Sequence, residues 1–401
     1  MLRLKGLSLF VITANLVFAL FSTSPALAST ERVLWSFGAA GDGSAPTGNL
    51  IPDASGNLYG VTLLGGTNNT GTVYELSPDG QGGWTESVLY SFGASGSGDG
   101  VQPEGGVVMD HSGNLYGTTF VGGTNNFGTV FELSPRAGGG WAETVLYSFG
   151  QFPDGRFPTD SPVLDADGNL YGTSSGALFE LSPGSTGWTE TILHAMPVTT
   201  EPNIGLIWRR VGVSLYGSVG SGGGIGLGGI YRLRREGTNW VETGLHSFNH
   251  TDGNPQTGGT LVEDQNLNLF GASNGGCANG TGGVWELIHN AGQPGTYQLL
   301  YSFGAEGSGD GNYPQSGVIL APNGTLYGTT GFGGANSDAG TVFSLASTQS
   351  GWQETILYTF TGGKDGGAPV GQLLRDNQGR LYGVTLRGGK FGGGALFRVT
   401  P

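Results

Sequence analysis

The stretch GNLYGTTFVGGTNNFGTVFELSP, residues 113–135, indicates the fold of this 401-residue chain. Two short runs rich in β-branched and aromatic residues flank a loop of Gly and Asn, which is the pattern of two strands joined by a connection. The same pattern, centred on Leu-Tyr-Gly or Leu-Phe-Gly, occurs seven times. The aromatic residue of each copy is Tyr59, Tyr116, Tyr171, Tyr216, Phe270, Tyr327 or Tyr382. Repeats of this period are typical of propellers and solenoids.

Each repeat contains four strand-like segments, which in the second repeat are 106–110, 114–119, 128–133 and 141–149. Four strands repeated seven times predict an all-β, seven-bladed β-propeller of four-stranded blades. The segment near the start of the chain resembles the fourth segment of a repeat, and the last segment resembles the third. We therefore expect the N-terminal strand to complete the last blade and close the ring, which would leave no free sheet edge there. The alternative is an open β-solenoid.

The first 28 residues carry the features of a secretory signal peptide. Arg3 and Lys5 precede an apolar run that ends in Ala26-Leu-Ala28, and small residues at this spacing favour cleavage after the last of them. We predict a signal peptide at 1–28 and the propeller at 29–401. The mature protein is then secreted, periplasmic or held at the cell surface, with no membrane contact after cleavage.

Two families resemble this sequence. The turn Asp165-Ala-Asp-Gly-Asn-Leu-Tyr171 is similar to the first hairpin of NHL-type propeller repeats, although Tyr-Gly-Thr follows where those repeats usually continue Tyr-Val-x-Asp. The longer pattern Tyr-Ser-Phe-Gly, Asp-Gly-x-x-Pro, Gly-Asn-Leu-Tyr-Gly-Thr-Thr, Gly-Gly-Thr-Asn-Asn and Gly-Thr-Val-Phe-Glu-Leu resembles the Gloeobacter/Verrucomicrobia (GloVer) tandem repeat of exported bacterial proteins. That resemblance implies a propeller and export, and it brings no catalytic residues with it.

The composition excludes several functions. The net charge is −14 and the chain has three Lys residues, whereas nucleic-acid binding requires a basic surface. A single cysteine, Cys277, excludes an internal disulfide framework and a cysteine-cluster zinc site. Gly accounts for 81 residues, yet aromatic residues are plentiful and charged ones few, so the chain is folded and rich in turns.

The loops between the fourth strand of one repeat and the first strand of the next share an Asp-Gly-x-x-Pro motif or a shorter form of it. Because these loops lead into the innermost strand, we expect their carboxylates at one mouth of the channel. They are candidate ligand-binding residues, and calcium is the cofactor they would suit. The alternative is a turn in which Asp accepts hydrogen bonds from its own backbone. The six residues are Asp42, Asp99, Asp154, Asp252, Asp310 and Asp365.

Three further residues are candidate ligand contacts. Asn68 and Asn125 occupy Gly-Gly-Thr-Asn-Asn loops that the topology places on the same face as the Asp-Gly loops. Arg209 interrupts the apolar first strand of the irregular fourth repeat, and its planar guanidinium suits a carboxylate such as that of a uronic acid. Polar loop conformation and sequence drift are the structural alternatives. No histidine joins a catalytic set in the predicted register.

We expect an exported binding or interaction module, with a glycan, a cation or a surface protein as partner. The first alternative is a carbohydrate-active enzyme, either a polysaccharide lyase or a glycoside hydrolase, which rests on analogy between folds. The second alternative is a structural surface scaffold. The residues identify no catalytic group and leave the question of enzymatic activity open.

Overall fold

The computed structural model describes residues 29–93, 98–150, 154–195, 206–209, 214–220, 228–254, 260–290, 295–304, 309–335 and 337–401. The signal peptide predicted at 1–28 lies outside these ranges. Strands, turns and loops make up the whole of the described chain, which therefore contains no helix that could span a membrane.

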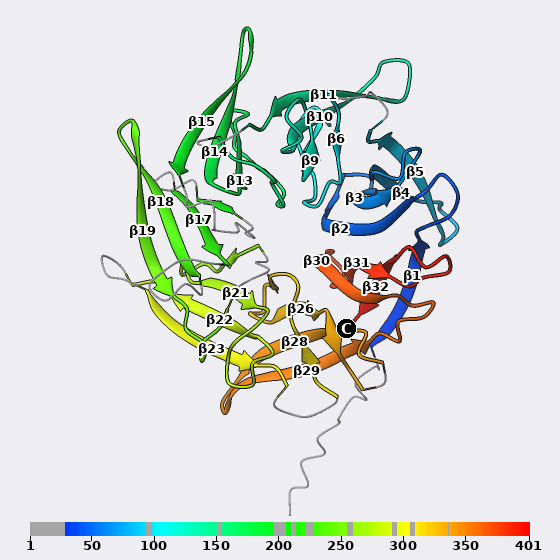
Figure 1. Ribbon diagram of the computed structural model, residues 1–401. Coiled ribbons are helices and arrows are strands. Elements are labelled where there is room, and N and C mark those ends of the chain that lie inside the picture. Colours follow the sequence, from blue (N-terminus) through cyan, green and yellow to red (C-terminus); the bar gives the residue numbers. More distant parts are fainter. Residues whose placement is uncertain are drawn as a thin grey trace, which may run out of the picture.

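The strands form seven four-stranded sheets arranged as blades around a central channel (Figure 1), as the repeats predict. From the channel outward, blade 1 contains β2 (Gly43–Pro52), β3 (Leu58–Gly65), β4 (Thr72–Pro78) and β5 (Trp84–Ser91). Blade 2 contains β7 (Val108–Met109), β8 (Leu115–Thr119), β10 (Thr129–Pro135) and β11 (Trp141–Ser148). Blade 3 contains β12 (Val163–Leu164), β13 (Leu170–Ser174), β14 (Ala177–Gly184) and β15 (Gly187–Ala195).

The remaining blades repeat this order. Blade 4 contains β16 (Ile207–Arg209), β17 (Ser214–Val219), β18 (Gly229–Glu236) and β19 (Asn239–Ser247). Blade 5 contains β20 (Val262–Glu263), β21 (Leu269–Ser273), β22 (Gly283–Ile288) and β23 (Thr296–Ser302). Blade 6 contains β25 (Ile319–Leu320), β26 (Leu326–Thr330), β28 (Thr341–Thr348) and β29 (Gly351–Thr359). Two short ribbons, β6 (Gly100–Val101) with β9 (Val121–Gly122) and β24 (Gly311–Asn312) with β27 (Phe332–Gly333), extend blades 2 and 6.

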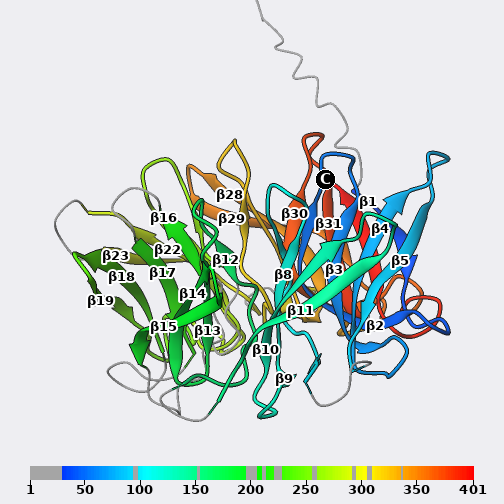
Figure 2. The same ribbon diagram turned by 90° about the horizontal axis from the view of Figure 1, so that it is seen from above.

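The last blade is built from both ends of the chain. It contains β30 (Gly367–Arg375), β31 (Leu381–Arg387), β32 (Ala395–Thr400) and β1 (Thr30–Ser36). Strand β1 pairs antiparallel with β32, with Thr30 opposite Thr400 and Ser36 opposite Ala395. The predicted closure is therefore confirmed, and it covers the outer edge of β32. In Figure 2 the blue β1 lies beside the red strands of the same blade.

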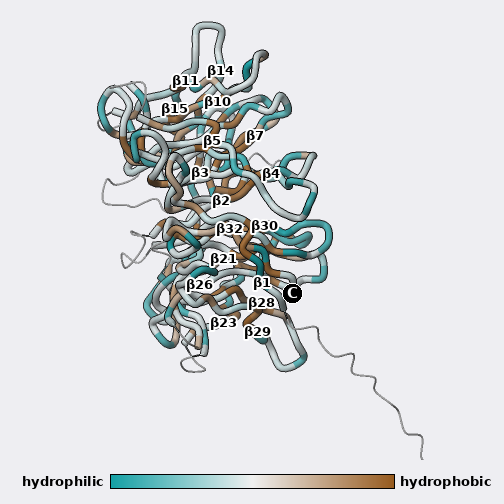
Figure 3. The backbone as a smooth tube through the Cα atoms, turned by 90° about the vertical axis from the view of Figure 1, so that its right-hand side faces the viewer, coloured by the Kyte–Doolittle hydropathy of each residue, from teal (hydrophilic) through white to brown (hydrophobic). Residues whose placement is uncertain are grey.

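The hydrophobic core lies between neighbouring blades. At the contact of blades 1 and 2, Tyr59 and Val61 pack with Leu115 and Phe131, all of them buried. Figure 3 shows hydrophobic segments along the strands and hydrophilic ones in the outer loops. The Gly of the Leu-Tyr-Gly motif makes this packing possible, because a Cβ on Gly117 would lie 2.5 Å from the Phe131 ring.

Candidate functional site

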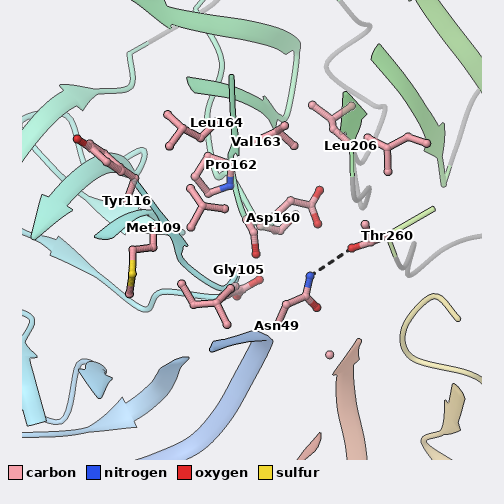
Figure 4. A pocket seen from close by; sticks show the side chains of 18 of the residues that line it. Asn49, Gly105, Met109, Tyr116, Asp160, Pro162, Val163, Leu164, Leu206 and Thr260 are labelled. Carbon is pink, nitrogen blue, oxygen red and sulfur yellow. Dashed lines mark hydrogen bonds between the residues drawn. The ribbon is translucent and has the colours of Figure 1, made fainter. Parts of the chain in front are cut away.

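A cavity of about 1370 Å³ runs along the central channel on the side of blades 1 to 4 (Figure 4). Its wall includes residues from the middle and the end of the innermost strand of blade 1, Thr47 and Pro52. The polar side chains in the wall include Asn49, Glu104, Asp160, Thr260 and Gln315. The apolar ones include Met109, Pro162, Leu164 and Trp208. The cavity therefore offers hydrogen-bonding groups beside apolar surface, the combination that small-ligand sites usually show.

Two carboxylates from adjacent blades enter this cavity. Asp160 leads into the inner strand of blade 3, and its Oδ2 accepts a hydrogen bond of 3.0 Å from the Thr173 hydroxyl. Its carbonyl oxygen accepts a second bond, of 2.9 Å, from Thr118 of blade 2. Glu104 leads into the inner strand of blade 2, and partial burial raises the pKa of its carboxyl group. The two acids thus have different surroundings in one cavity.

Hydrogen bonds join the inner strands on the other side of the channel. Asn49 of blade 1 donates from Nδ2 to the Thr260 hydroxyl of blade 5, at 3.2 Å (Figure 4). The Gln372 backbone N–H of blade 7 donates to Asn49 Oδ1 at 2.8 Å, and its side chain reaches the Val318 carbonyl of blade 6. These bonds link four blades and fix the wall of the cavity that faces blades 2 and 3.

Glycines allow the inner strands to approach one another closely. A Cβ on Gly105 would lie 2.2 Å from the carbonyl carbon of Asp160, and one on Gly317 would lie 2.0 Å from the carbonyl oxygen of Thr260. No side chain fits at either position, because the neighbouring atoms belong to backbone. The channel wall is therefore held by direct backbone contact between blades.

The six predicted aspartates lie outside the cavity wall, at the contacts between blades. Asp42, Asp99 and Asp310 are buried. Asp99 accepts a hydrogen bond of 3.0 Å from the Tyr90 hydroxyl, and Asp365 accepts one of 3.0 Å from Tyr358. Backbone N–H groups of the same loops also donate to these carboxylates, the Gly304 N–H to Asp310 at 2.6 Å and the Thr361 N–H to Asp365 at 2.7 Å. Calcium binding here stays a prediction, and the described residues bring no three His, Cys, Asp or Glu side chains together around a metal-sized space.

The rest of the Asp-Gly-x-x-Pro motif also connects blades. The residue before Pro has a positive φ, as in Gln102 at 58°, and its N–H donates to the Thr70 carbonyl of the preceding blade at 2.8 Å. Pro103 packs against Gly71 of that blade so closely that a Cβ there would lie 2.6 Å from the proline ring. The motif therefore acts as a clamp between neighbouring blades.

Asn68 and Asn125 hold loops in place. Each donates from Nδ2 to the carbonyl at the end of the outermost strand of its own blade, Asn68 to Phe92 at 3.2 Å and Asn125 to Phe149 at 3.1 Å. Both lie outside the cavity wall. A ligand role for them stays a prediction.

Arg209 pairs within the protein. Its guanidinium forms an ion pair with Glu263 of blade 5 and donates to the Tyr216 hydroxyl at 2.8 Å. It also lies over the Tyr216 ring, 4.4 Å from the centroid. A carboxylate ligand would have to compete with Glu263 for this side chain.

Sequence reasoning missed Glu104 and Asp160. A usable signal lay directly after the proline of each clamp, where the chain enters the inner strand. The residues there differ between repeats: Thr47-Gly, Glu104-Gly, Thr159-Asp, Gln315-Ser and Val370-Gly. A position that varies in charge on the channel side of an otherwise regular repeat is a candidate for specific contacts.

The chain matches a known family of repeat proteins. The Gloeobacter/Verrucomicrobia repeat matches residues 18–210 and 292–401. The chain belongs to this repeat family. Among curated proteins no sequence matches. The GloVer match covers more than half of the chain and brackets blades 4 and 5, where the repeat is least regular.

Solved structures with the same fold share little sequence with this GloVer protein. Virginiamycin B lyase from Staphylococcus aureus aligns with a TM-score of 0.57 at 11% identity, over 93% of this chain and 99% of that one. YCF48 from Cyanidioschyzon merolae aligns with a TM-score of 0.53 at 12% identity, over 94% and 99%. At such identities the likeness establishes the propeller fold alone.

Proposed function

We propose that this GloVer protein is an exported binding module whose channel cavity takes a neutral, polyhydroxylated ligand such as a glycan segment. The observation that carries the proposal is the lining of the cavity. Carboxylate, amide and hydroxyl groups of Asp160, Asn49 and Thr260 face the same space as the apolar Met109 and Trp208. Sugar rings present hydroxyl edges and apolar faces, and they fit such a mixed wall.

Aromatic side chains beside the cavity support the same ligand class. Tyr313 and Phe332 of blade 6 are 40% and 38% exposed, with ring centroids 6.0 Å apart. Gln315, a wall residue, donates from its side chain to the Tyr313 carbonyl at 3.3 Å. The backbone of Tyr313 therefore adjoins the cavity wall, and we infer that the two exposed rings offer a stacking surface to a sugar that extends out of the cavity.

Binding to a panel of soluble neutral and uronic polysaccharides tests this proposal. We expect one neutral polysaccharide to bind the mature protein, and Asp160→Asn to weaken that binding about tenfold, since a hydrogen bond to a charged group contributes at least this much. Glu132→Gln is the matched control, because Glu132 lies on β10 away from the cavity. A mature protein that binds none of the panel would contradict the proposal.

The second candidate is a glycoside hydrolase that uses the same cavity. Two carboxylates face it, and burial raises the pKa of Glu104, which is what a general acid requires. Glu104 would then protonate the leaving oxygen while Asp160 acts as base or nucleophile. Release of reducing sugar from the bound polysaccharide, abolished by Glu104→Gln, would favour this candidate. Binding without release would favour the binding module.

A further inference from the structure

Neighbouring blades meet at seams, and five of them contain two acidic side chains. One is the Asp of the clamp that joins the two blades, and the other is a Glu on the outermost strand of the second blade. A Tyr hydroxyl lies against four of these pairs, from the outermost strand of the first blade. The five Asp–Glu pairs are Asp42–Glu86, Asp99–Glu143, Asp154–Glu190, Asp310–Glu354 and Asp365–Glu31.

The seam between blades 2 and 3 shows the arrangement. The Tyr147 hydroxyl donates to Glu190 Oε2 at 3.0 Å, and Asp154 Oδ2 accepts from the Gly150 N–H. The carboxyl group of Asp154 lies near enough to that of Glu190 to raise its pKa. Asp154 Oδ1 and Glu190 Oε1 are both buried and have no hydrogen-bond donor. One proton between the two acids would supply the missing donor.

The seam between blades 1 and 2 has the same deficit. Asp99 is 4% exposed, and Tyr90 occupies only its Oδ2. Asp99 Oδ1 and Glu143 Oε1 are buried without a donor. At the seam between blades 7 and 1, where the ring closes, Asp42 Oδ2 and Glu86 Oε1 are likewise buried without a hydrogen-bond donor. None of the ion pairs found among the described residues includes Asp42, Glu86, Asp99 or Glu143.

The two remaining seams, on either side of blade 4, have a different composition. His194 and His246 take the place of the Tyr. At the first, His194 pairs with Glu242 at 2.7 Å. At the second, His246 pairs with Asp252 at 3.2 Å, while Tyr297 occupies the position of the Glu. The described residues thus place two acids at each seam without a His and one acid beside each His.

We propose that each Asp–Glu pair is closed by one proton held between the two carboxyl groups, so that the blades bind one another most tightly in acid and less tightly as the pH rises. Two buried carboxylates at one seam cannot both be ionised without mutual repulsion. The titratable groups that face the pairs from neighbouring strands are tyrosines: Tyr74, Tyr90, Tyr147, Tyr301 and Tyr358. A tyrosine side chain carries no positive charge in either protonation state.

Electrostatics support the proposal. Burial and then the neighbouring aspartate raise the pKa of Glu31, Glu143 and Glu190 to about 7, and burial and then Asp42 raise the pKa of Glu86 to about 9. A carboxyl group with a raised folded pKa binds its proton more tightly in the folded state. Its stabilising effect is therefore complete below the unfolded value of about 4.3 and is lost as the pH rises through the folded value.

Thermal unfolding of the mature protein between about pH 5 and pH 9 tests the proposal. We expect the melting temperature to fall across this range. Glu143→Gln and Glu190→Gln keep a hydrogen-bond donor at each pair without a proton, so we expect unchanged melting in acid and a flatter fall above neutrality. Glu132→Gln, on β10 and outside any pair, should keep the slope of the wild type.

Infrared spectroscopy provides a second measurement that does not depend on stability. Protonated carboxyl groups absorb apart from carboxylates, and we expect a protonated band in the folded protein at neutral pH that weakens in the Gln variants. Absence of this band, or equal destabilisation of the variants at both ends of the pH range, would overturn the proposal. So would a calcium-dependent rise in melting temperature that the Gln variants lose, because a cation would then occupy the pairs.

Discussion

The seams that contain Tyr and the seams that contain His place different side chains beside their acidic residues. At the Tyr seam of blades 1 and 2, Asp99 is buried and receives a neutral hydroxyl. At the His seam of blades 3 and 4, the His194 and Glu242 side chains are 36% and 39% exposed and pair directly. The regular seam between blades 1 and 2 therefore contains a buried acid, whereas the seam that leads into the degenerate blade 4 contains a more exposed His–Glu pair.

The largest expected effect is a difference in stability between two Gly→Ala substitutions, one in the clamp between blades 1 and 2 and one in the outer strand of blade 4. A Cβ on Gly100 would lie 2.4 Å from the Thr119 hydroxyl and 2.6 Å from that of Thr129, and these two hydroxyls bond to each other inside blade 2. We expect Gly100→Ala to reduce the free energy of unfolding by about 3 kcal/mol, as overpacking does. Calorimetry measures this.

Gly244 supplies the matched control on β19, because a Cβ there would meet no atom within 4 Å. We expect Gly244→Ala to leave stability unchanged or to raise it by about 0.5 kcal/mol. Equal losses of stability in the two variants would show that Gly100 is no more tightly packed than Gly244.

An intermediate effect distinguishes the aspartates of the two seam types. At about pH 8 we expect Asp99→Asn to keep or raise the melting temperature, because it removes one of two adjacent acids. Asp252→Asn should instead cost about 1 kcal/mol, because Asp252 accepts from the Asn249 N–H at 2.6 Å and pairs with His246. Parallel melts of both variants at the same pH are the measurement. Loss of stability in both would contradict the comparison.

The smallest effect concerns His194. The hydrogen bond that His194 donates to Glu242 raises the pKa of His194, and partial burial opposes this effect. Its contribution to stability is present below the unfolded pKa of about 6.5 and is lost as the pH rises through the folded value. His194→Gln should therefore cost about 0.5 kcal/mol in acid, a small value because the pair is half exposed, and almost nothing in alkali. An equal loss of stability in acid and in alkali would show that the charge of His194 does not contribute to stability.

The fold was predictable because each repeat contains the local sequence features that specify its strands and turns. Strand-forming residues alternate, Leu-Tyr-Gly recurs, and the end segments fit one blade. The turn Asp is a local requirement: Asp53 accepts from the Ser55 and Asn57 N–H groups at 2.8 and 2.9 Å. A turn that a residue makes with its own neighbours can be inferred without knowing what surrounds it.

The candidate site was not predictable in the same way. The sequence placed Asp99 at a mouth of the channel, whereas the structure buries it at a seam against Tyr90 and Glu143. It gave no prominence to Asp160, which the structure places in the cavity wall. Both residues sit in the same kind of loop, a few positions apart. Their different surroundings depend on how neighbouring blades approach.

By itself, the sequence determined the seven repeats, the four strands in each, and the closure of the ring by β1 against β32. These follow from local patterns and from which segments the two ends supply. Only the tertiary structure decided which polar groups face the channel and which face another blade. Contacts such as Asn49 with Thr260, or Asp99 with Glu143, join residues of different blades, and their chemistry exists only once the ring has closed.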